Sequence, residues 1–188
     1  MGEERRTLMK DLATRRQWLT TSGLVAGGVA LGPTRGLAAE PEGISHSAEA
    51  IHQEPTFTAS PARVYEVLMS SQQFDKVIQT SGVMQSTFMQ KMKKPTEINR
   101  EEGGTFTLFG GHIFGRHIEL VPDELIVQAW RVSNWDRGAY SIARFELATT
   151  KSGTKVIFDH TGFPNGDAEH LAEGWRAHYW EPMQRVLS

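Results

Sequence analysis

The 188-residue chain contains no cysteine. Disulfide bonds, thiolate zinc sites, a lipid-anchored cysteine and a cysteine nucleophile are therefore excluded. A membrane-spanning helix is not predicted either. The apolar stretch of residues 20–31 contains glycines and is shorter than the roughly 20 residues that such a helix needs.

Positive charge is scarce in the body of the chain. The formal net charge is −2 at pH 7. Residues 1–39 carry six Lys and Arg and three acidic residues, so residues 40–188 have a net charge of −5. A net-acidic body without a basic run argues against nucleic acid as the main partner. The length suits one domain with a real core plus an appendage.

The first 39 residues have the layout of an export signal. The basic pair Arg15-Arg16 precedes the mildly apolar stretch of residues 20–31, and small residues end the segment at 36–39. This order is typical of a secretory signal, and the paired arginines resemble the twin-arginine type. An amphipathic arm that happens to contain Arg-Arg is the alternative. We predict a signal peptide over residues 1–39 and a periplasmic or secreted mature protein.

The mature chain is predicted to begin with a flexible leader, residues 40–50, because this stretch is polar and poor in apolar side chains. A single folded domain then covers residues 51–188. Residues 51–58 have the composition of a strand, but Pro55 cannot donate a hydrogen bond to a neighbouring strand. We therefore expect an edge strand or a bulge at this point.

Two short helices should follow. Ser60 and Pro61 predict the start of the first, since Ser caps the free N–H groups and Pro fits the first turn. The second is expected at residues 71–78. Residues 83–95 are ambiguous, because their methionine and phenylalanine spacing suits both a helix and a strand. They predict either a mobile flap over a pocket or a covering helix packed on the sheet.

The centre of the chain predicts an antiparallel meander. Alternating apolar residues are typical of half-buried strands, and Gly110-Gly111 and Pro122-Asp123 mark turns between them. Five strands are expected: 105–109, 113–121, 125–135, 140–149 and 154–161.

A last helix is predicted from residue 168 to about 187, with Asp167 as its cap. Its apolar and aromatic residues form roughly one stripe. Pro182 removes one hydrogen bond and should bend the helix near His178. A bent helix across a curved sheet leaves space between them, and that space is the predicted site.

Several short motifs resemble a known family. In chain order they include GGTFTLFGGHIFGRHIELVP at 103–122, IVQAWR at 126–131, HTGFP at 160–164 and GWR at 174–176. The sequence resembles the C-terminal domain of the activator of heat-shock protein 90 ATPase, within the SRPBCC (START-like) superfamily, over residues 51–187.

The resemblance implies an α+β helix-grip fold. An antiparallel sheet would wrap around a long C-terminal helix, with two short N-terminal helices and often an apolar cavity. The superfamily includes lipid carriers and polyketide cyclases. Two features depart from the family. Residues 83–95 look like an insertion. The export signal would place the protein outside the cytosol, where no ATP-driven cytosolic chaperone is expected, so the co-chaperone role does not transfer.

The candidate site follows from this geometry. We predict as cavity residues Phe109, Trp130, Arg131, His160, Trp175, His178 and Tyr179. Along one strand, Trp130 should face one side while Arg131 and Trp135 face the other. If the protein is an enzyme, His160 or His178 is the acid or base, and Tyr179 or Arg131 holds a ligand oxygen. A structural role in the core is the alternative for Trp130 and for each histidine.

The sequence gives little support for a metal site or for the catalytic triad of a hydrolase. His112 and His117 should face opposite sides of a strand, and no close-set group such as H-E-x-x-H occurs. Asp159 and His160 are neighbours on a strand and cannot pair directly. We therefore predict no metal, no cofactor and no catalytic residue.

The sequence predicts an exported protein that holds a small apolar or amphipathic molecule between the sheet and the C-terminal helix. A cyclase- or hydratase-like enzyme is one alternative, and it would need at least two polar groups converging inside the cavity. A co-chaperone-like protein-interaction module is the other. It would need a sizeable exposed apolar patch and a filled interior.

Overall fold

The computed structural model describes residues 48–87 and 89–188. These residues belong to one compact unit, Gly43–Ser188. The predicted signal peptide, with Arg15 and Arg16, and most of the predicted leader lie outside the described residues. Within the described part of the chain, no helix is long and apolar enough to cross a membrane.

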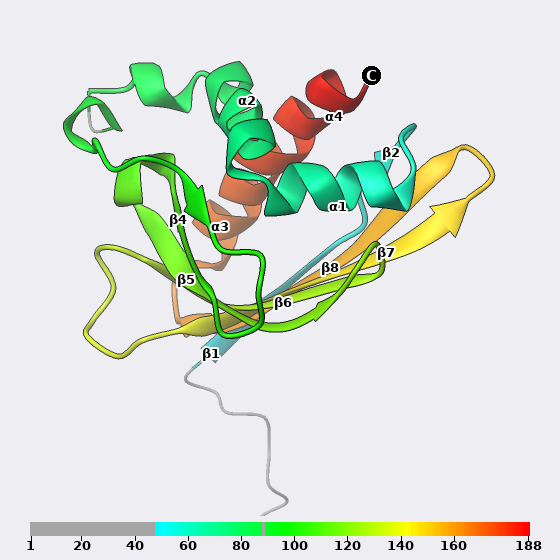
Figure 1. Ribbon diagram of the computed structural model, residues 1–188. Coiled ribbons are helices and arrows are strands. Elements are labelled where there is room, and N and C mark those ends of the chain that lie inside the picture. Colours follow the sequence, from blue (N-terminus) through cyan, green and yellow to red (C-terminus); the bar gives the residue numbers. More distant parts are fainter. Residues whose placement is uncertain (1–47, 88) are drawn as a thin grey trace, which may run out of the picture. The chain divides into compact units, whose positions relative to one another are not determined.

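The core of the fold is one antiparallel sheet (Figure 1). Its strand order is β1-β8-β7-β6-β5-β4-β3, with β2 also paired to β8. The strands are β1 (Ala48–Gln53), β2 (Thr56–Phe57), β3 (Glu97–Ile98), β4 (Thr105–Leu108), β5 (Ile113–Val121), β6 (Leu125–Val132), β7 (Ser141–Thr150) and β8 (Gly153–Pro164). The predicted meander is confirmed, although β6 ends three residues earlier and β8 three residues later than expected.

The strand expected over residues 51–58 is interrupted, as its proline predicts. The chain leaves β1 after Gln53 and re-enters the sheet at β2, and between them the carbonyl of Pro55 accepts a hydrogen bond from the Val156 N–H at 2.9 Å. β1 lies at one edge of the sheet. A proline is tolerated there because its missing N–H breaks no ladder between two strands.

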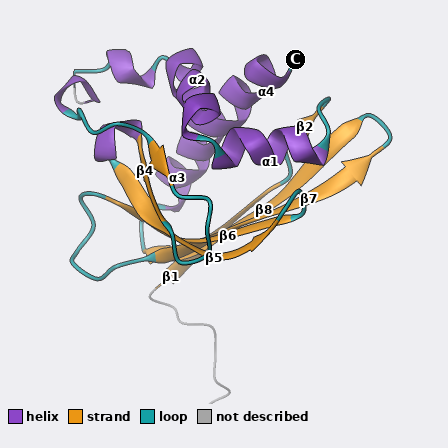
Figure 2. Ribbon diagram, viewed as in Figure 1, coloured by secondary structure: helices purple, strands orange, loops and turns teal. Residues whose placement is uncertain are grey.

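The helices are α1 (Pro61–Met69), α2 (Ser71–Ser81), α3 (Ala168–Trp175) and α4 (Glu181–Leu187). Figure 2 shows them on the same face of the sheet. The side chain of Ser60 caps α1 by accepting from the Arg63 N–H, as predicted. Ser70 caps α2 in the same way through the Gln73 N–H.

The C-terminal helix runs from α3 into α4 without a gap, but the turn between them is not α-helical. A π-helical turn, Arg176–Trp180, joins α3 to α4. Pro182 has no N–H to donate to the carbonyl of His178, so the regular helix cannot persist through this turn. The bend predicted near His178 stays a prediction; the structure shows a π-helical turn at this position.

Asp167 precedes α3 but does not cap it with its side chain. The Glu49 carboxylate accepts instead from the Ala168 N–H at 2.9 Å. The carboxylate of Asp167 is occupied elsewhere, because it accepts from the indole Nε1 of Trp135 at 2.8 Å. Asp167 thus holds the N-cap position as predicted, but its side chain does not cap the helix and instead ties the loop after β6 to the start of the helix.

The described residues of the segment 83–95, namely 83–87 and 89–95, form neither the covering helix nor a strand. They contain two short 3₁₀ turns, Val83–Gln85 and Met89–Lys91. The end of the segment is fixed by a tertiary contact, since the Lys94 N–H donates to the Gly110 carbonyl at 3.1 Å. A Cβ atom at Gly110 would lie 2.5 Å from the carbonyl oxygen of Met92. This close approach, which is not local in sequence, determines the path of the segment.

Candidate functional site

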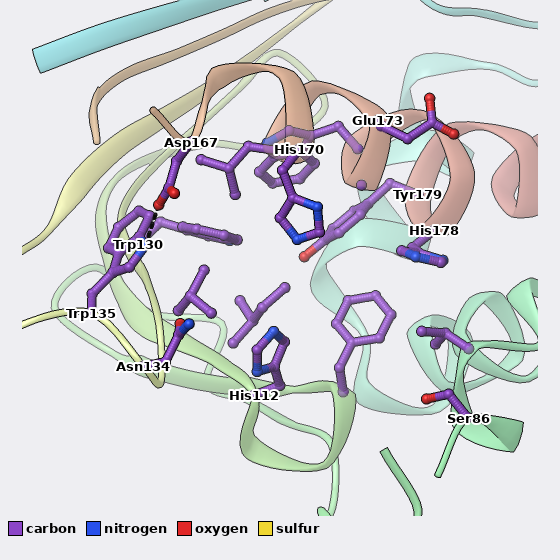
Figure 3. Close-up of a pocket in the computed structure, with 17 residues that line it drawn as sticks. Ser86, His112, Trp130, Asn134, Trp135, Asp167, His170, Glu173, His178 and Tyr179 are labelled. Carbon is purple, nitrogen blue, oxygen red and sulfur yellow. Dashed lines mark hydrogen bonds between the residues drawn. The ribbon is translucent and has the colours of Figure 1, made fainter. Parts of the chain in front are cut away.

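A cavity of about 400 Å³ opens between the first half of the C-terminal helix and the adjoining ends of β5 and β6. Figure 3 shows the side chains around it. Its volume lies within the range of roughly 300–1,000 Å³ that is common for small-molecule sites. The cavity is lined by the apolar and aromatic residues Val83, Phe109, Ile113, Trp130, Val132, Trp135, Leu171, Trp175 and Tyr179.

The inner wall is a packed aromatic cluster. The Tyr179 ring lies 4.2 Å from Trp175 and 5.4 Å from Phe109, centroid to centroid. Trp175 in turn lies 5.5 Å from Trp130. Because these rings are buried and pack against one another, the protein itself holds the wall in place.

Polar side chains surround the aromatic wall: Ser86, His112, Asn134, Asp167, His170, Glu173 and His178. Figure 3 shows the imidazoles of His112 and His170 directed into the cavity from opposite sides. Burial lowers the pKa of His112 and that of His178, and the nearby His170 lowers both further. His112 and His178 are therefore uncharged at neutral pH. Among the residues that the structure describes, no group of three or more His, Asp or Glu is arranged to hold a metal ion.

Three buried polar atoms of the lining have no hydrogen-bond partner among the described residues. They are Nε1 of Trp130, Nδ1 of His178 and the hydroxyl oxygen of Tyr179. Burial raises the pKa of the Tyr179 hydroxyl, and the neighbouring Trp130 indole opposes that rise without reaching hydrogen-bond geometry. Buried polar groups are nearly always paired with protein or water. Three unpaired atoms among the described residues of one cavity lining are therefore unusual.

Five of the seven predicted site residues line this cavity: Phe109, Trp130, Trp175, His178 and Tyr179. They come from the turn after β4, from β6 and from the C-terminal helix. The arrangement brings together residues up to 70 positions apart in the sequence, and it agrees with the expected space between sheet and helix. Their role in binding stays a prediction.

Arg131 does not line the cavity. Its guanidinium packs beside the rings of Phe114 and Tyr140, 5.3 Å from each centroid. It also donates to the backbone carbonyls of Trp135 and Asp136, at 2.6 and 3.1 Å. Alternation along β6 sends Arg131 to the face opposite Trp130, so it supports the loop behind the cavity and cannot reach a ligand oxygen within it.

Trp135 was expected on the same face as Arg131, and this is wrong. β6 ends at Val132 and the chain turns, so strand alternation no longer applies. The Trp135 ring lies 5.5 Å from Trp130 in an edge-to-face contact and lines the cavity. The polar run Ser133-Asn134 was the signal in the sequence that the strand had ended.

His160 is buried beside the cavity but does not line it. Trp175 Nε1 donates to its Nδ1 at 3.0 Å. Since Nδ1 must then be unprotonated, Nε2–H donates to the Ser141 hydroxyl at 2.6 Å, which donates to the Trp130 carbonyl at 3.0 Å. Burial lowers the pKa of His160 to about 3. With both ring nitrogens paired, it is a structural residue and not the acid or base considered above. Asp159 faces the other way, as predicted, and pairs with His52 at 2.7 Å.

Except for His178, sequence reasoning missed all of the polar lining, namely Ser86, His112, Asn134, Asp167, His170 and Glu173. A topological signal was present. In a meander, every second connection lies at the same end of the sheet. The β4–β5 turn, the β6–β7 loop and the exit from β8 therefore meet at one end, where His112, Asn134 and Asp167 are found.

An antiparallel sheet closed over a C-terminal helix, with short helices before the main strands and a cavity inside, defines a START-like helix-grip protein. Residues 58–188 match the family described as "Activator of Hsp90 ATPase homolog 1-like protein". This match covers more than half of the chain, and the chain belongs to that family.

Solved structures share the fold. An Hsp90 activator from Plasmodium falciparum superposes with a TM-score of 0.60 at 21% identity, covering 75% of this chain and 96% of that one. The Aha1 dimer from Colwellia psychrerythraea superposes with a TM-score of 0.54 at 16% identity, covering 74% and 96%. At such identities the likeness shows the fold alone.

Curated relatives carry related names. The activator of 90 kDa heat shock protein ATPase homolog 1 of Homo sapiens is 24% identical over 149 residues, 79% of this chain and 40% of that protein. The homolog of Dictyostelium discoideum is 36% identical over 89 residues, 47% of this chain and 23% of that protein. The chain thus spans less than half the length of these relatives.

Proposed function

We propose that this domain binds one small amphipathic molecule in the cavity between the sheet and the C-terminal helix. The observation that carries the proposal is the combination of a packed aromatic wall with three buried polar atoms, on Trp130, His178 and Tyr179, that have no partner among the described residues. An apolar body would bury surface against the rings, while a polar group would satisfy the unpaired atoms.

Gly174 offers a direct test. It lines the cavity within α3, and a Cβ atom added there would meet no atom within 4 Å. Gly174→Leu should therefore project into open space and obstruct ligand entry. It should also raise helix stability by roughly 0.5–1 kcal/mol. Gly174→Ala is the matched control, because it makes the same backbone change without filling the space.

The measurement is native mass spectrometry of wild type and both variants, expressed as the full chain and purified from the compartment where each accumulates. The proposal expects a stoichiometric small molecule on wild type and Gly174→Ala, and its loss from Gly174→Leu. Wild-type protein that is always empty would contradict it, as would a bound molecule that Gly174→Leu retains.

A protein-interaction role is the second candidate, because the curated relatives are named as activators of a heat-shock protein ATPase. Tyr140 and Ile142, 49% and 39% exposed, are the large apolar side chains that would serve it on the outer face of the sheet. Recovery of a defined partner chain by wild type, and its loss from the double variant Tyr140→Ser/Ile142→Ser, would support this role.

Export through the twin-arginine route remains part of the proposal. It places the mature domain in the periplasm, away from cytosolic ATP-driven chaperones, and so favours a ligand over such a partner. Replacing Arg15 and Arg16 together by Lys should leave unprocessed precursor in the cytoplasm. Normal processing of that variant would remove the twin-arginine assignment and leave the cavity argument intact.

A further inference from the structure

Two hydrogen-bond donors lie unused in the inner wall of the cavity. Trp130 is 2% exposed and Tyr179 is 4% exposed, yet neither the indole N–H nor the hydroxyl has a partner among the described residues. Figure 3 shows the Tyr179 hydroxyl directed toward the middle of the cavity. The donors come from different elements, β6 and the π-helical turn before α4, so their convergence is a product of the tertiary fold.

Among the described residues, no acceptor lies within hydrogen-bond distance of the Tyr179 hydroxyl. Its ring neighbours include Phe74, Phe109 and Trp175, whose side chains have no acceptor atom. The Trp130 indole lies near but can only donate. The hydroxyl hydrogen therefore requires an acceptor that enters the cavity.

The charge around the cavity restricts what that acceptor can be. Two carboxylates, Asp167 and Glu173, belong to the lining, and no Lys or Arg does within the part of the chain that the structure describes. His112 and His178 have lowered pKa values and add no positive charge at neutral pH. Arg176, which is not part of the lining, pairs with Glu173 and compensates its charge. An anionic ligand would thus meet the carboxylate of Asp167 with no lysine or arginine of the lining to bind it.

We propose that the ligand is an uncharged carbonyl compound, a ketone, aldehyde or ester on an apolar body, whose oxygen accepts from both Trp130 Nε1–H and Tyr179 O–H. A carbonyl oxygen has two lone pairs and can accept both donors at once. This assignment rests on the proposed function, because it names the chemistry of the molecule held in the same cavity.

Three probes of similar size test it: 2-acetylnaphthalene, 2-ethylnaphthalene and 2-naphthoate. The first carries the carbonyl, the second replaces it with a methylene, and the third replaces it with a carboxylate. By equilibrium dialysis against the wild-type protein at pH 7.5, the ketone should bind about 10-fold more tightly than either of the others. This ranking requires no variant.

Tyr179→Phe then assigns the preference to the hydroxyl. It should reduce the advantage of 2-acetylnaphthalene over 2-ethylnaphthalene to about 3-fold or less and leave 2-ethylnaphthalene binding within about 2-fold of wild type. Tyr65→Phe is the matched control, since Tyr65 is buried in α1 and does not line the cavity. It should leave the ranking unchanged.

The outcomes separate the two proposals. Equal binding of ketone and ethyl probes, or tighter binding of 2-naphthoate, would overturn the carbonyl assignment and leave small-molecule binding in place. Failure of all three probes to bind wild type would count against the proposed function itself. A ketone preference that persists in Tyr179→Phe would overturn the role of the hydroxyl.

Discussion

Two histidines lie in the aromatic layer between the sheet and the C-terminal helix, and their surroundings differ. His160 has a partner at both ring nitrogens, Trp175 on one side and Ser141 on the other. His178 has a buried Nδ1 with no partner among the described residues, and the neighbouring hydroxyl of Tyr179 is also unpaired. We call the first region the closed centre and the second the open end.

The difference distinguishes the structural role of the closed centre from the binding role proposed for the open end more clearly than residue type does. Both regions contain histidine, tryptophan and apolar rings, so composition alone would rank them equally. In the closed centre, folding has already satisfied each polar atom of the His160 network. At the open end the unpaired atoms belong to residues that line a cavity, and we propose that a ligand satisfies them there.

The largest expected effect comes from replacing Trp175, which contacts residues of both regions. Trp175 is buried against Phe158, at 4.4 Å, and Tyr179, at 4.2 Å between centroids, and it donates to His160. Trp175→Ala should lower the free energy of unfolding by about 3–5 kcal/mol, as large aromatic-to-alanine changes in cores do. Urea denaturation followed by circular dichroism measures this loss.

Trp175→Ala should also weaken binding of 2-acetylnaphthalene by 10-fold or more, because Trp175 lines the cavity. If stability falls while affinity stays the same, Trp175 belongs to the closed centre alone. Trp175→Phe is the control for packing. It keeps a ring but leaves His160 Nδ1 unpaired, and it should cost about 1–3 kcal/mol.

The second largest expected effect is a loss of folding stability at low pH, caused by His160 in the closed centre. The folded-state pKa of His160 is lowered to about 3 from 6.5, so the unfolded chain binds a proton in this range and the folded chain does not. The stability that His160 provides is complete above pH 6.5 and declines as the pH falls toward 3. Between pH 7 and pH 4 the loss attributable to His160 should be about 3 kcal/mol.

The difference between wild type and His160→Gln isolates this contribution, since the carboxylates titrate in both proteins. The variant should lose less stability than wild type over the same interval. It should keep part of the slope, because burial also lowers the pKa of His117, to about 4. If the free energy of unfolding falls equally in both proteins between pH 7 and pH 4, the fold does not hold His160 in its neutral form.

Much of the fold was predictable because its signals are local. Alternation in β5, β7 and β8 and the caps at Ser60 and Pro61 each act within a few residues. Residues 83–95 were not predictable, since their apolar spacing fits two periods. Their path depends on contact with Gly110, which only the tertiary structure provides.

The part of the site that follows from packing the C-terminal helix against the sheet was predictable. A C-terminal helix over a meander brings Trp130, Trp175 and Tyr179 together. The state of His160 was not predictable, because its partners lie 15 and 19 residues away in the sequence. Trp135 was misplaced because the strand was extended beyond Val132.

The smallest expected effect is the sharpest test of the comparison. Ser141→Ala in the closed centre removes a hydroxyl that accepts from His160 and donates to the Trp130 carbonyl. It leaves the Nε2–H of His160 without its partner and should cost about 1–3 kcal/mol. Tyr179→Phe at the open end removes a hydroxyl without a partner among the described residues. In ligand-free protein it should leave the free energy of unfolding unchanged or raise it by up to about 1 kcal/mol.

Chemical denaturation of the two variants beside wild type decides the matter. If both variants lose the same free energy of unfolding, water already pairs the Tyr179 hydroxyl as firmly as the protein pairs Ser141. The polar atoms of the open end would then be satisfied without a ligand, as those of the closed centre are. A loss confined to Ser141→Ala would mean that the Tyr179 hydroxyl contributes nothing to folding. Burying an unpaired donor has a cost for the fold, so a hydroxyl that contributes only when the cavity is filled is best explained by the ligand it binds.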